Sequence, residues 1–432
     1  MKKFFDFVVG CLACACLAGL AAHAQPASPQ FQVDDALYNK LVAIRQDLHA
    51  HPELAGQEKR TAATVAAHLR SLGLEVQTGH YGHSVVGLLR GARPGKTIAW
   101  RAELDALAGE FADPTPFKSS TPGVHHACGH DIHIAIAIGM AEVLARQRHT
   151  LQGTVVFVFQ PEEETFKGAK ALLERGVFAA LAPDEMYGAH VTALPVGQIV
   201  VRANEMFAYA RRVSIRLTPG LTPQDIEQLT QRVQRALVRA RPGAKPWELH
   251  AAGDPAIGLA SPATAFQDYL ILDRAFDVHT QNGELVLEAY VYETAASRLD
   301  HILPGIQRTI AASGHAAKLR GLSFVQADPT VMNSAKLTGQ ALGTLQQSGG
   351  PAVVRLGYGQ VPFFNDDFAY FQQKVPGVYF FLGGSNAAKG IIAMNHAPGF
   401  QVDEQSIRVG VESFASLMAA RLQVPRDGPP AE

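Results

Sequence analysis

The sequence predicts an α/β protein in which a largely parallel sheet, flanked by helices, is interrupted by a smaller α+β domain. From residue 34 to residue 205, strand-like runs alternate with segments of helical periodicity, as in a parallel sheet covered by helices. One run, residues 155–159, contains only β-forming apolar residues and suits a central strand buried on both faces. Near Ala210 the order changes to β-α-β-β-α, and near Val353 the first pattern returns.

The length and composition are those of an ordinary globular protein. The 432 residues suffice for two or three domains with cores of their own. Hydrophobic residues make up 47% and charged residues 18%, which excludes a chain that is disordered throughout. The net charge is −1, and lysine and arginine form no long run, so we expect no nucleic acid partner.

Residues 1–24 have the anatomy of a secretory signal peptide, with two lysines, an apolar stretch and a small-residue pattern at 22–24. The alternatives are an uncleaved membrane anchor and lipidation at Cys11. Asp6 interrupts the apolar run, which leaves it short of the ~20 residues that span a bilayer. We therefore expect cleavage after Ala24 and a bacterial protein that is periplasmic or secreted, with no membrane contact after cleavage.

The first part of the large domain is predicted to span residues 25–205. Its expected helices are residues 34–48, 61–72, 132–145 and 168–174. Its expected strands are residues 74–76, 85–89, 97–100, 155–159 and 186–190. Because functional sites of such sheets gather at the carboxyl ends of the strands, residues that directly follow a strand deserve the closest inspection.

The inserted domain is predicted to span residues 206–324, and residues 325–432 complete the large domain. The insert combines a strand at 213–217, an amphipathic helix at 223–240 and a tight hairpin at Asn282-Gly283. A further helix passes through Leu299 and Ile306, bent or split at Pro304. The closing part has strand-like runs at 353–356 and 377–382 and a helix at 403–422.

Cys128 is the only cysteine that remains after signal cleavage, so it has no disulfide partner in an exported chain. Gly129 separates it from His130, which lets a tight turn direct both side chains to one point. Five of the nine residues at 125–133 are His or Asp, which packing alone does not explain. The alternative is a buried cysteine beside an unrelated histidine. The pattern favours a metal site, with Asp131 supporting a ligand.

Three adjacent glutamates, Glu162 to Glu164, follow the apolar run at 155–159. Neighbouring carboxylates at the end of a buried strand repel each other unless a cation or a proton compensates. An exposed acidic turn is the alternative, but the position after a central strand favours a functional site. Adjacent carboxylates also permit one to bind metal while the other moves protons.

Three more residues complete the candidate site. His190 closes a predicted strand and His396 lies near the C-terminus; each alone is more often structural than a ligand. Asp105 ends another strand and either orients a ligand or lies on the surface. With Glu163 as a base, five side chains suffice for two metal ions that share one ligand: Cys128, His130, Glu164, His190 and His396. A thiolate with imidazoles favours zinc, and the carboxylate also admits manganese or cobalt.

Six segments of the chain resemble motifs of the di-metal aminoacylase/carboxypeptidase family. They read HHACGHDIH, VFVFQPEEE, GAHV, RAELDAL, FNDDFAYF and NHAPGF. The most similar branch contains hippurate hydrolases, bacterial N-acyl-amino-acid amidohydrolases and plant auxin-conjugate hydrolases. The resemblance covers residues 35–205 and 325–425.

The resemblance implies a metallopeptidase-type α/β domain interrupted by a lid or dimerisation domain. Position by position, it makes Cys128, His130, Glu164, His190 and His396 the metal ligands, with Cys128 bridging the ions. It makes Glu163 the catalytic base and Asp105 and Asp131 orienting residues. It also implies a small-molecule amide substrate, hydrolysis by a metal-activated water, and a homodimer.

The inserted domain departs from the family pattern. The branch has a Gly-His-Gly-Ala-x-Pro-His segment after the first strand of the lid, which supplies a histidine to the active site. Residues 215–223 here contain no histidine. The lid asparagine and arginine that usually bind a substrate carboxylate in the branch also lack clear matches, and Tyr290 or Tyr292 occupies the approximate place of the arginine. His250, His279 or a lid tyrosine is a candidate substitute for the lid histidine, and the sequence identifies no substrate-binding residue.

The leading hypothesis is an exported amidohydrolase that cleaves an N-acyl amino acid or a related small amide. One alternative is a dipeptidase or carboxypeptidase of the same fold. Another is a metal-holding binding protein whose altered lid has impaired catalysis, although binding alone does not require a base beside Glu164.

Overall fold

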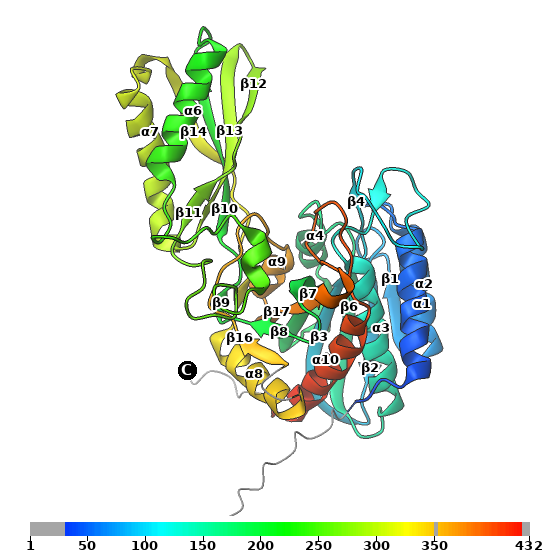
Figure 1. Cartoon of the computed structure of the whole chain (residues 1–432). Coiled ribbons are helices and arrows are strands. Elements are labelled where there is room, and N and C mark those ends of the chain that lie inside the picture. Colours follow the sequence, from blue (N-terminus) through cyan, green and yellow to red (C-terminus); the bar gives the residue numbers. More distant parts are fainter. Residues whose placement is uncertain (1–30, 350–352, 426–432) are drawn as a thin grey trace, which may run out of the picture.

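The computed structural model describes residues 31–349 and 353–425, so the predicted signal peptide lies outside the described residues. A large domain built on an eight-stranded sheet carries a small domain with a five-stranded sheet of its own (Figure 1). The predicted fold class is therefore confirmed. Within the described ranges, no helix is long and apolar enough to cross a membrane.

The sheet of the large domain is parallel at its centre; β1 and β2 extend it antiparallel on one side, and on the other side β8 pairs antiparallel with β17 and parallel with the edge strand β16. Its strand order is β1-β2-β6-β3-β7-β17-β8-β16. The bounds are β1 Glu75–Thr78, β2 Val85–Arg90, β3 Arg93–Glu103, β6 Gln152–Gln160, β7 Glu185–Pro195, β8 Ile199–Val201, β16 Val354–Leu356 and β17 Gly377–Ser385. The consecutive pairs β6–β3, β3–β7 and β7–β17 are all parallel, so their carboxyl ends meet at one edge.

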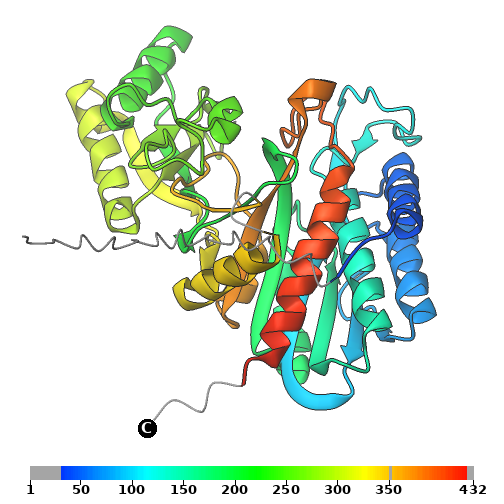
Figure 2. The same ribbon diagram turned by 60° about the horizontal axis from the view of Figure 1, so that its bottom comes forward.

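Helices cover both faces of this sheet, and Figure 2 shows α10 (red) crossing one of them beside α3. The helices on that face are α1 Asp35–Ala50, α2 Lys59–Ser71, α3 His130–Arg146, α8 Ala335–Gly349 and α10 Gln405–Gln423. The opposite face carries α4 Gly168–Glu174, α5 Val177–Leu181 and α9 Phe368–Gln372. Every residue of α3 from His130 to Leu144 is buried, because α1, α10 and the sheet surround it.

The small domain packs two helices on one sheet. Its strands are β10 Tyr209–Leu217, β11 Leu270–Leu272, β12 Asp277–Gln281, β13 Glu284–Glu293 and β14 Leu319–Gln326, and its helices are α6 Pro223–Leu237 and α7 Ile302–Ala312. Asn282 and Gly283 both have positive φ, 51° and 78°, as a two-residue hairpin turn requires, so the predicted hairpin is confirmed. The predicted boundaries at 206 and 324 stay a prediction, although β14 continues to Gln326.

Short elements complete the chain. They are β4 Leu107–Ala108, β5 Val124–His125, β9 Asn204–Glu205, β15 Met332–Asn333, and the 3₁₀ helices η1 Leu249–Gly253, η2 Ala296–His301, η3 Ala316–Lys318 and η4 Ala387–Lys389. The helix expected around Pro304 is split. η2 ends at His301 and α7 begins at Ile302, which places Pro304 in the first turn, where a missing N–H breaks no helical hydrogen bond.

Helix α6 is shorter than predicted, since it ends at Leu237 and not at Ala240. Val238 is extended, and Arg239 exchanges two backbone hydrogen bonds of 2.9 Å with Leu270. This pairing begins a stretch, residues 238–269, that we call the cap segment. The sequence did not predict its course.

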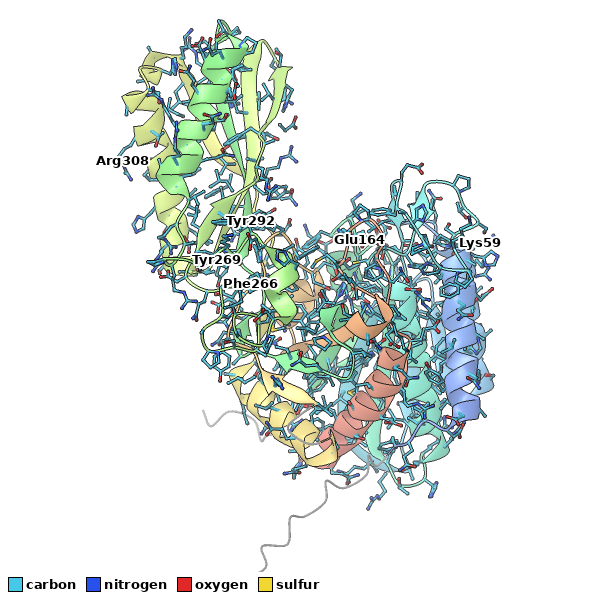
Figure 3. All side chains as sticks on the ribbon, in the orientation of Figure 1. Lys59, Glu164, Phe266, Tyr269, Tyr292 and Arg308 are labelled. Atoms are coloured by element: carbon cyan, nitrogen blue, oxygen red, sulfur yellow. The ribbon has the colours of Figure 1, made fainter. Side chains whose placement is uncertain are left out.

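The cap segment leaves the small domain and packs against the large one. Phe266 and Tyr269 are fully buried in the core between the two domains, and Figure 3 shows both at the base of the small domain. The Tyr269 hydroxyl donates a 2.7 Å hydrogen bond to the carbonyl of Gln360, whose N–H donates to the carbonyl of Phe266 at 2.7 Å. The cap segment therefore anchors the small domain on the large one.

This anchoring predicts that Phe266→Ala is strongly destabilising. Removal of a fully buried phenylalanine costs about 3–5 kcal/mol, and here the loss falls on the contact between the domains. Trp247→Ala is the matched control, because Trp247 belongs to the same segment but is 37% exposed. Thermal unfolding of both variants checks the expectation, and equal melting temperatures for the two would contradict it.

Candidate metal centre and active site

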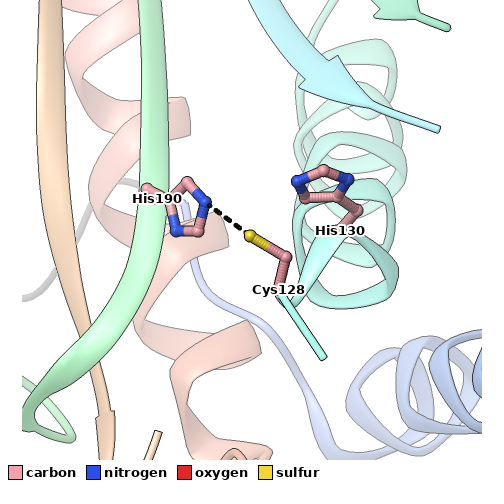
Figure 4. Close-up of side chains that lie close together, drawn as sticks. All are labelled: Cys128, His130 and His190. Carbon is pink, nitrogen blue, oxygen red and sulfur yellow. Dashed lines mark hydrogen bonds between the residues drawn. The ribbon is translucent and has the colours of Figure 1, made fainter. Parts of the chain in front are cut away.

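The candidate residues gather where the parallel strands end. Strand β3 ends at Glu103 just before Asp105, β6 ends just before the glutamate run, and β7 carries His190. Cys128 and His130 arrive from the turn into α3, and Figure 4 shows both facing His190. This is the edge of the sheet at which the alternation of strands and helices predicts a site.

The structure brings all five predicted ligands together. Cys128 Sγ lies 3.3 Å from His190 Nε2 and 3.1 Å from His396 Nε2. Glu164 Oε1 lies 3.4 Å from His396 Nε2 and 3.9 Å from His130 Nε2. Two groups result, Cys128 with His130 and His190, and Cys128 with Glu164 and His396, each with its ligand atoms within 4.8 Å of one another. Cys128 belongs to both, which is the place of a bridging ligand.

The turn between Cys128 and His130 requires a glycine. Gly129 has a φ of 96°, and a Cβ at this position would collide with Cγ1 of Val191 on β7. The close approach of the turn to β7 is what places the thiol beside His190. Asn395 holds the facing loop, because its amide donates to the carbonyls of Cys128 at 2.9 Å and Val191 at 3.0 Å. Asn395 was not predicted as a site residue, although it opens the quoted NHAPGF motif.

The unsatisfied atoms of this cluster fit bound cations. His130 Nε2 and Glu164 Oε1 are buried and have no hydrogen-bond partner, and each such atom costs about 1–3 kcal/mol. Burial, together with the carboxylates of Glu164 and Glu163, raises the pKa of the Cys128 thiol well above its ordinary value. A divalent cation reverses this effect and stabilises the thiolate. One thiolate, three imidazoles and one carboxylate suit two divalent ions, zinc, manganese or cobalt.

Hydrogen bonds orient the ligands as a metal site needs. His130 Nδ1 donates to the carbonyl of Asp105 at 2.8 Å, and His190 Nδ1 donates to the carbonyl of Val191 at 2.8 Å. Both rings therefore turn Nε2 toward the cluster. Asp105 is fully buried, and its carboxylate accepts from the N–H of Glu164 at 2.9 Å. This position supports the predicted orienting role of Asp105.

Glu163 lies in the same cluster but in neither of the two groups that contain Cys128; a further group joins it with His130 and Glu164. Its Oε2 is 3.8 Å from His130 Nε2, and its side chain is buried. Burial and the nearby carboxylates of Asp366 and Glu164 raise its pKa well above the ordinary value. A carboxylate with a raised pKa is a stronger base, and so it suits proton transfer near neutral pH.

A buried charge cluster beneath Glu163 was not predicted. Arg101 on β3 is fully buried and ion-paired with Asp366, with Asp367 at 2.7 Å and with Glu103. Burial, which outweighs the effect of Arg101, raises the pKa of Asp367 to about 7. The signal was available in RAELDAL and FNDDFAYF, but neither pattern shows that its charged residues meet beneath the base.

A second contact that was not predicted, between His133 and Glu103, helps to position His190. His133 Nδ1 donates to Glu103 at 2.7 Å, and its Nε2 accepts the N–H of Val191 at 2.9 Å. The ring of His133 packs edge-on against His190 with centroids 4.7 Å apart. His133 therefore fixes the part of β7 that carries a ligand. It was counted in the His- and Asp-rich run without a role of its own.

Asp131 contacts Arg45 and His49 of α1, and its predicted role in orienting a ligand stays a prediction. Its carboxylate contacts Arg45 Nε at 2.8 Å and His49 Nδ1 at 2.8 Å. Burial would raise the pKa of Asp131, but these two cations hold it well below its usual range. Helical geometry explains these contacts, since successive residues point about 100° apart around the axis. His130 faces the cluster, and Asp131 faces α1.

The apolar space beside the ligands is a cavity of about 220 Å³ whose lining includes Cys128, Glu163 and His396. A second, more polar hollow shares Glu164 and Asn365 with it and is also lined by Tyr290 and Tyr292. Neither lining contains a lysine or an arginine among the residues that the structure describes.

Only the tyrosines, among the candidate substitutes for the lid histidine, border the site. Tyr290 and Tyr292 line the second hollow beside Glu164. His250 on η1 is exposed and lines neither hollow, and His279 lies on β12 beside Asp277. Of these candidates, a tyrosine therefore has the position that best suits a substitute for the lid histidine.

An α/β sheet that ends in a thiolate, imidazole and carboxylate cluster with an adjacent buried base defines a metal-dependent hydrolase. Comparison with known proteins agrees. The model of peptidase family M20/M25/M40 matches residues 99–420, and the chain belongs to this family. It is a hydrolase of amide bonds that uses two metal ions.

The curated relatives and the solved structures match over most of the chain. The thermostable carboxypeptidase 1 of Saccharolobus solfataricus is 31% identical over 87% of this chain and 94% of its own length. The N-acetylcysteine deacetylase of Bacillus subtilis is 28% identical over 90% of this chain and 99% of its own. The crystal structure of the Bacillus subtilis YXEP protein, described as a dinuclear metal binding peptidase, has a TM-score of 0.72 at 26% identity, covering 90% of this chain and 99% of that one.

The ligand cluster predicts that His130→Ala loses bound metal. The Nε2 atom of His130 is buried in the cluster, has no hydrogen-bond partner and offers its lone pair to a metal ion. Removal of this ligand should therefore lower the metal content by one ion or more per chain. His125→Ala is the matched control, since His125 lies in the same motif but in neither of the two ligand groups. Elemental analysis after dialysis against zinc measures both, and two retained ions in His130→Ala would refute the assignment.

The buried ion pairs of Asp131 predict a loss of stability in Asp131→Asn with unchanged metal content. Breaking a buried ion pair costs about 3–5 kcal/mol, whereas Asp35→Asn, which removes an exposed pair with Arg408, should cost less than about 1 kcal/mol.

The pH dependence of Asp131→Asn has a definite sign. Because the folded-state pKa of Asp131 is depressed, its stabilisation is complete above the unfolded-state pKa of about 3.9 and is lost as the pH falls further. The difference from wild type in denaturant unfolding should therefore shrink in acid. Wild-type stability combined with a metal affinity weakened about 10–100-fold would instead support the orienting role.

Proposed function

We propose that the chain is an exported amidohydrolase that cleaves the amide bond of an N-acyl amino acid or a related small amide. The observation that carries the proposal is Glu163, a buried base 3.8 Å from a metal ligand and at the wall of an apolar cavity. Relatives named as a deacetylase of N-acetylcysteine and of N-acetyldiaminopimelate support this choice of bond and substrate.

The protein's own groups supply the proton transfers. When bound, the two ions supply Lewis-acid activation of water and of the scissile carbonyl. Glu163 then takes up the proton of the attacking water at its carboxylate and passes it to the leaving nitrogen. Asp366 and Asp367 behind Glu163 raise its proton affinity, and Arg101 keeps the three carboxylates from repelling each other apart.

The second candidate is a dipeptidase or carboxypeptidase of the same fold. The thermostable carboxypeptidase relative, at 31% identity, favours it. A panel of N-acyl amino acids, dipeptides and N-blocked dipeptides separates the two, because a dipeptidase prefers a free amino group on the acyl side and a carboxypeptidase requires a residue with a free carboxylate on the amine side. A metal-holding binding protein without catalysis is disfavoured by Glu163, since binding alone gains nothing from a buried base beside Glu164.

Export and assembly complete the proposal. The two lysines, the apolar stretch and the small-residue pattern of residues 1–24 support cleavage of a signal peptide and a periplasmic or secreted enzyme. A homodimer is supported by β14, which lies at the edge of the small sheet and can pair with a strand of a second copy.

The role of Glu163 predicts that Glu163→Gln keeps both ions and lowers kcat about 10²–10⁴-fold. The amide preserves the shape of the side chain but cannot take up a proton. Glu162→Gln is the matched control, because Glu162 is the neighbouring glutamate and lies in none of the ligand groups. The rate of N-acyl amino acid hydrolysis and the metal content are measured on the same preparations. Wild-type turnover in Glu163→Gln would contradict the role of Glu163 as the base.

A further inference from the structure

The cavity beside the metal ligands is apolar over most of its wall. Its hydrophobic lining residues include Phe207, Leu249, Ala252, Leu259, Val361 and Phe381. Apolar cavities of about 150 Å³ take up a ring as large as benzene, and this cavity measures about 220 Å³. It therefore has room for an aromatic ring or a branched aliphatic chain.

Three of these residues come from the cap segment of the inserted domain. Leu249, Ala252 and Leu259 belong to the cap segment, whereas Val361 and Phe381 belong to the large domain. The 3₁₀ helix η1, which carries Leu249 and Ala252, packs against β7, the strand of His190. One wall of the cavity is thus built by an excursion of the inserted domain and not by the metal-binding fold.

Hydrogen bonds hold this wall in place. The carbonyl of Leu259 accepts the N–H of Tyr358 at 2.8 Å, and the carbonyl of Ala252 accepts the N–H of Leu259 at 2.9 Å. Leu259 is 2% exposed, and Ala252 is 8% exposed. The backbone of the cap segment is thus hydrogen-bonded within the segment and to the large domain. The segment therefore presents a fixed apolar surface to a ligand in the cavity.

The two hollows beside Glu164 differ in polarity, which distinguishes the halves of an amide. Away from the metal ligands and Glu163, the cavity wall is mainly hydrophobic; the second hollow shares Phe166, Phe363 and Phe364 with it but adds Tyr290, Gln326 and Asp328. In an N-acyl amino acid, the acyl group is apolar and the amino acid half carries polar groups. The acyl group therefore suits the cavity, and the leaving amine suits the second hollow.

We propose that the cap segment is the acyl-selectivity element of this enzyme: Leu249, Ala252 and Leu259 wall the acyl site, favour a bulky apolar acyl group over acetyl, and set its maximum size. The inference rests on the proposed function, because it assigns the two halves of an amide substrate. Ala252 is the residue at which added bulk enters the site most directly, since a methyl group is all that it contributes to the wall.

The test uses the full-length, zinc-loaded enzyme and a series of acyl groups on one amine: N-acetylglycine, N-benzoylglycine and N-(2-naphthoyl)glycine. Wild type should hydrolyse the benzoyl substrate with a kcat/KM at least about tenfold above that of the acetyl substrate. Ala252→Phe should lower kcat/KM for the benzoyl substrate at least about tenfold and leave the acetyl substrate within about threefold. Leu249→Ala should shift the preference toward the naphthoyl group, because it enlarges the cavity.

Ala256→Phe is the matched control, because Ala256 lies in the same segment but is exposed and lines neither hollow. Equal loss in Ala252→Phe and Ala256→Phe would overturn the proposal, as would a wild-type preference for acetyl. If Ala252→Phe fails to fold, Leu249→Ala, at a half-buried position, decides the matter by the same substrate series.

A binding measurement separates failure of this inference from failure of the proposed function. Benzoate and acetate are titrated calorimetrically into zinc-loaded wild type and Ala252→Phe. Tighter binding of benzoate that Ala252→Phe abolishes supports the acyl site even if no N-acyl glycine is hydrolysed, which would refute only the proposed reaction. Equal binding of the two acids to wild type, alongside normal hydrolysis, would refute the acyl site alone.

Discussion

The active-site edge of the large domain depends on a balance of buried charge. Glu103, Glu163, Asp366 and Asp367 are all buried at the carboxyl ends of the central strands, where ionised groups lose most of their hydration. Within the described residues, Arg101 forms ion pairs with three of these four carboxylates, Glu103, Asp366 and Asp367. These pairs connect the first and last parts of the large domain next to Glu163. The remaining negative charge, on Cys128 and Glu164, is what two bound ions neutralise. Metal binding and folding of this edge are therefore linked.

Local signals point to Cys128, just before helix α3, and to Glu164, shortly after strand β6. His190 and His396 were predicted only as members of the set, and a parallel sheet brings positions that follow its strands to one edge. The ion pairs of Asp131 with Arg45 and His49 were not predicted, because adjacency in sequence does not show that His130 and Asp131 point to different sides of α3. Arg101 and its partners Asp366 and Asp367 belong to two motifs, RAELDAL and FNDDFAYF, which the whole inserted domain separates in the sequence, and no contact between them was predicted. Their meeting is a tertiary event that no local periodicity encodes.

The cap segment shows the same limit on a larger scale. Residues 238–269 contain neither a helical nor an alternating pattern of useful length, so their position follows from contacts with the large domain alone. At the start of the segment, pairing of Arg239 with Leu270 on β11 of the small domain withdraws the backbone from α6 and ends that helix early. The segment belongs to the insert by chain order but to the large domain by packing. Because it is hydrogen-bonded to the large domain and buried against it, the cap segment forms a fixed wall beside the metal ligands.

The buried thiol joins the chemistry to the proposed compartment. Among the residues that the structure describes, Cys128 is the only free cysteine, and it is 6% exposed. Oxidants attack thiolates that are accessible, whereas a thiolate shared by two cations in a closed site is neither exposed nor free to react. The pKa of Cys128 is raised in the absence of cations, so the metal-free site holds a neutral, less reactive thiol. Both forms of the site are thus protected in an oxidising environment, which lets an exported enzyme retain a cysteine ligand without a disulfide partner.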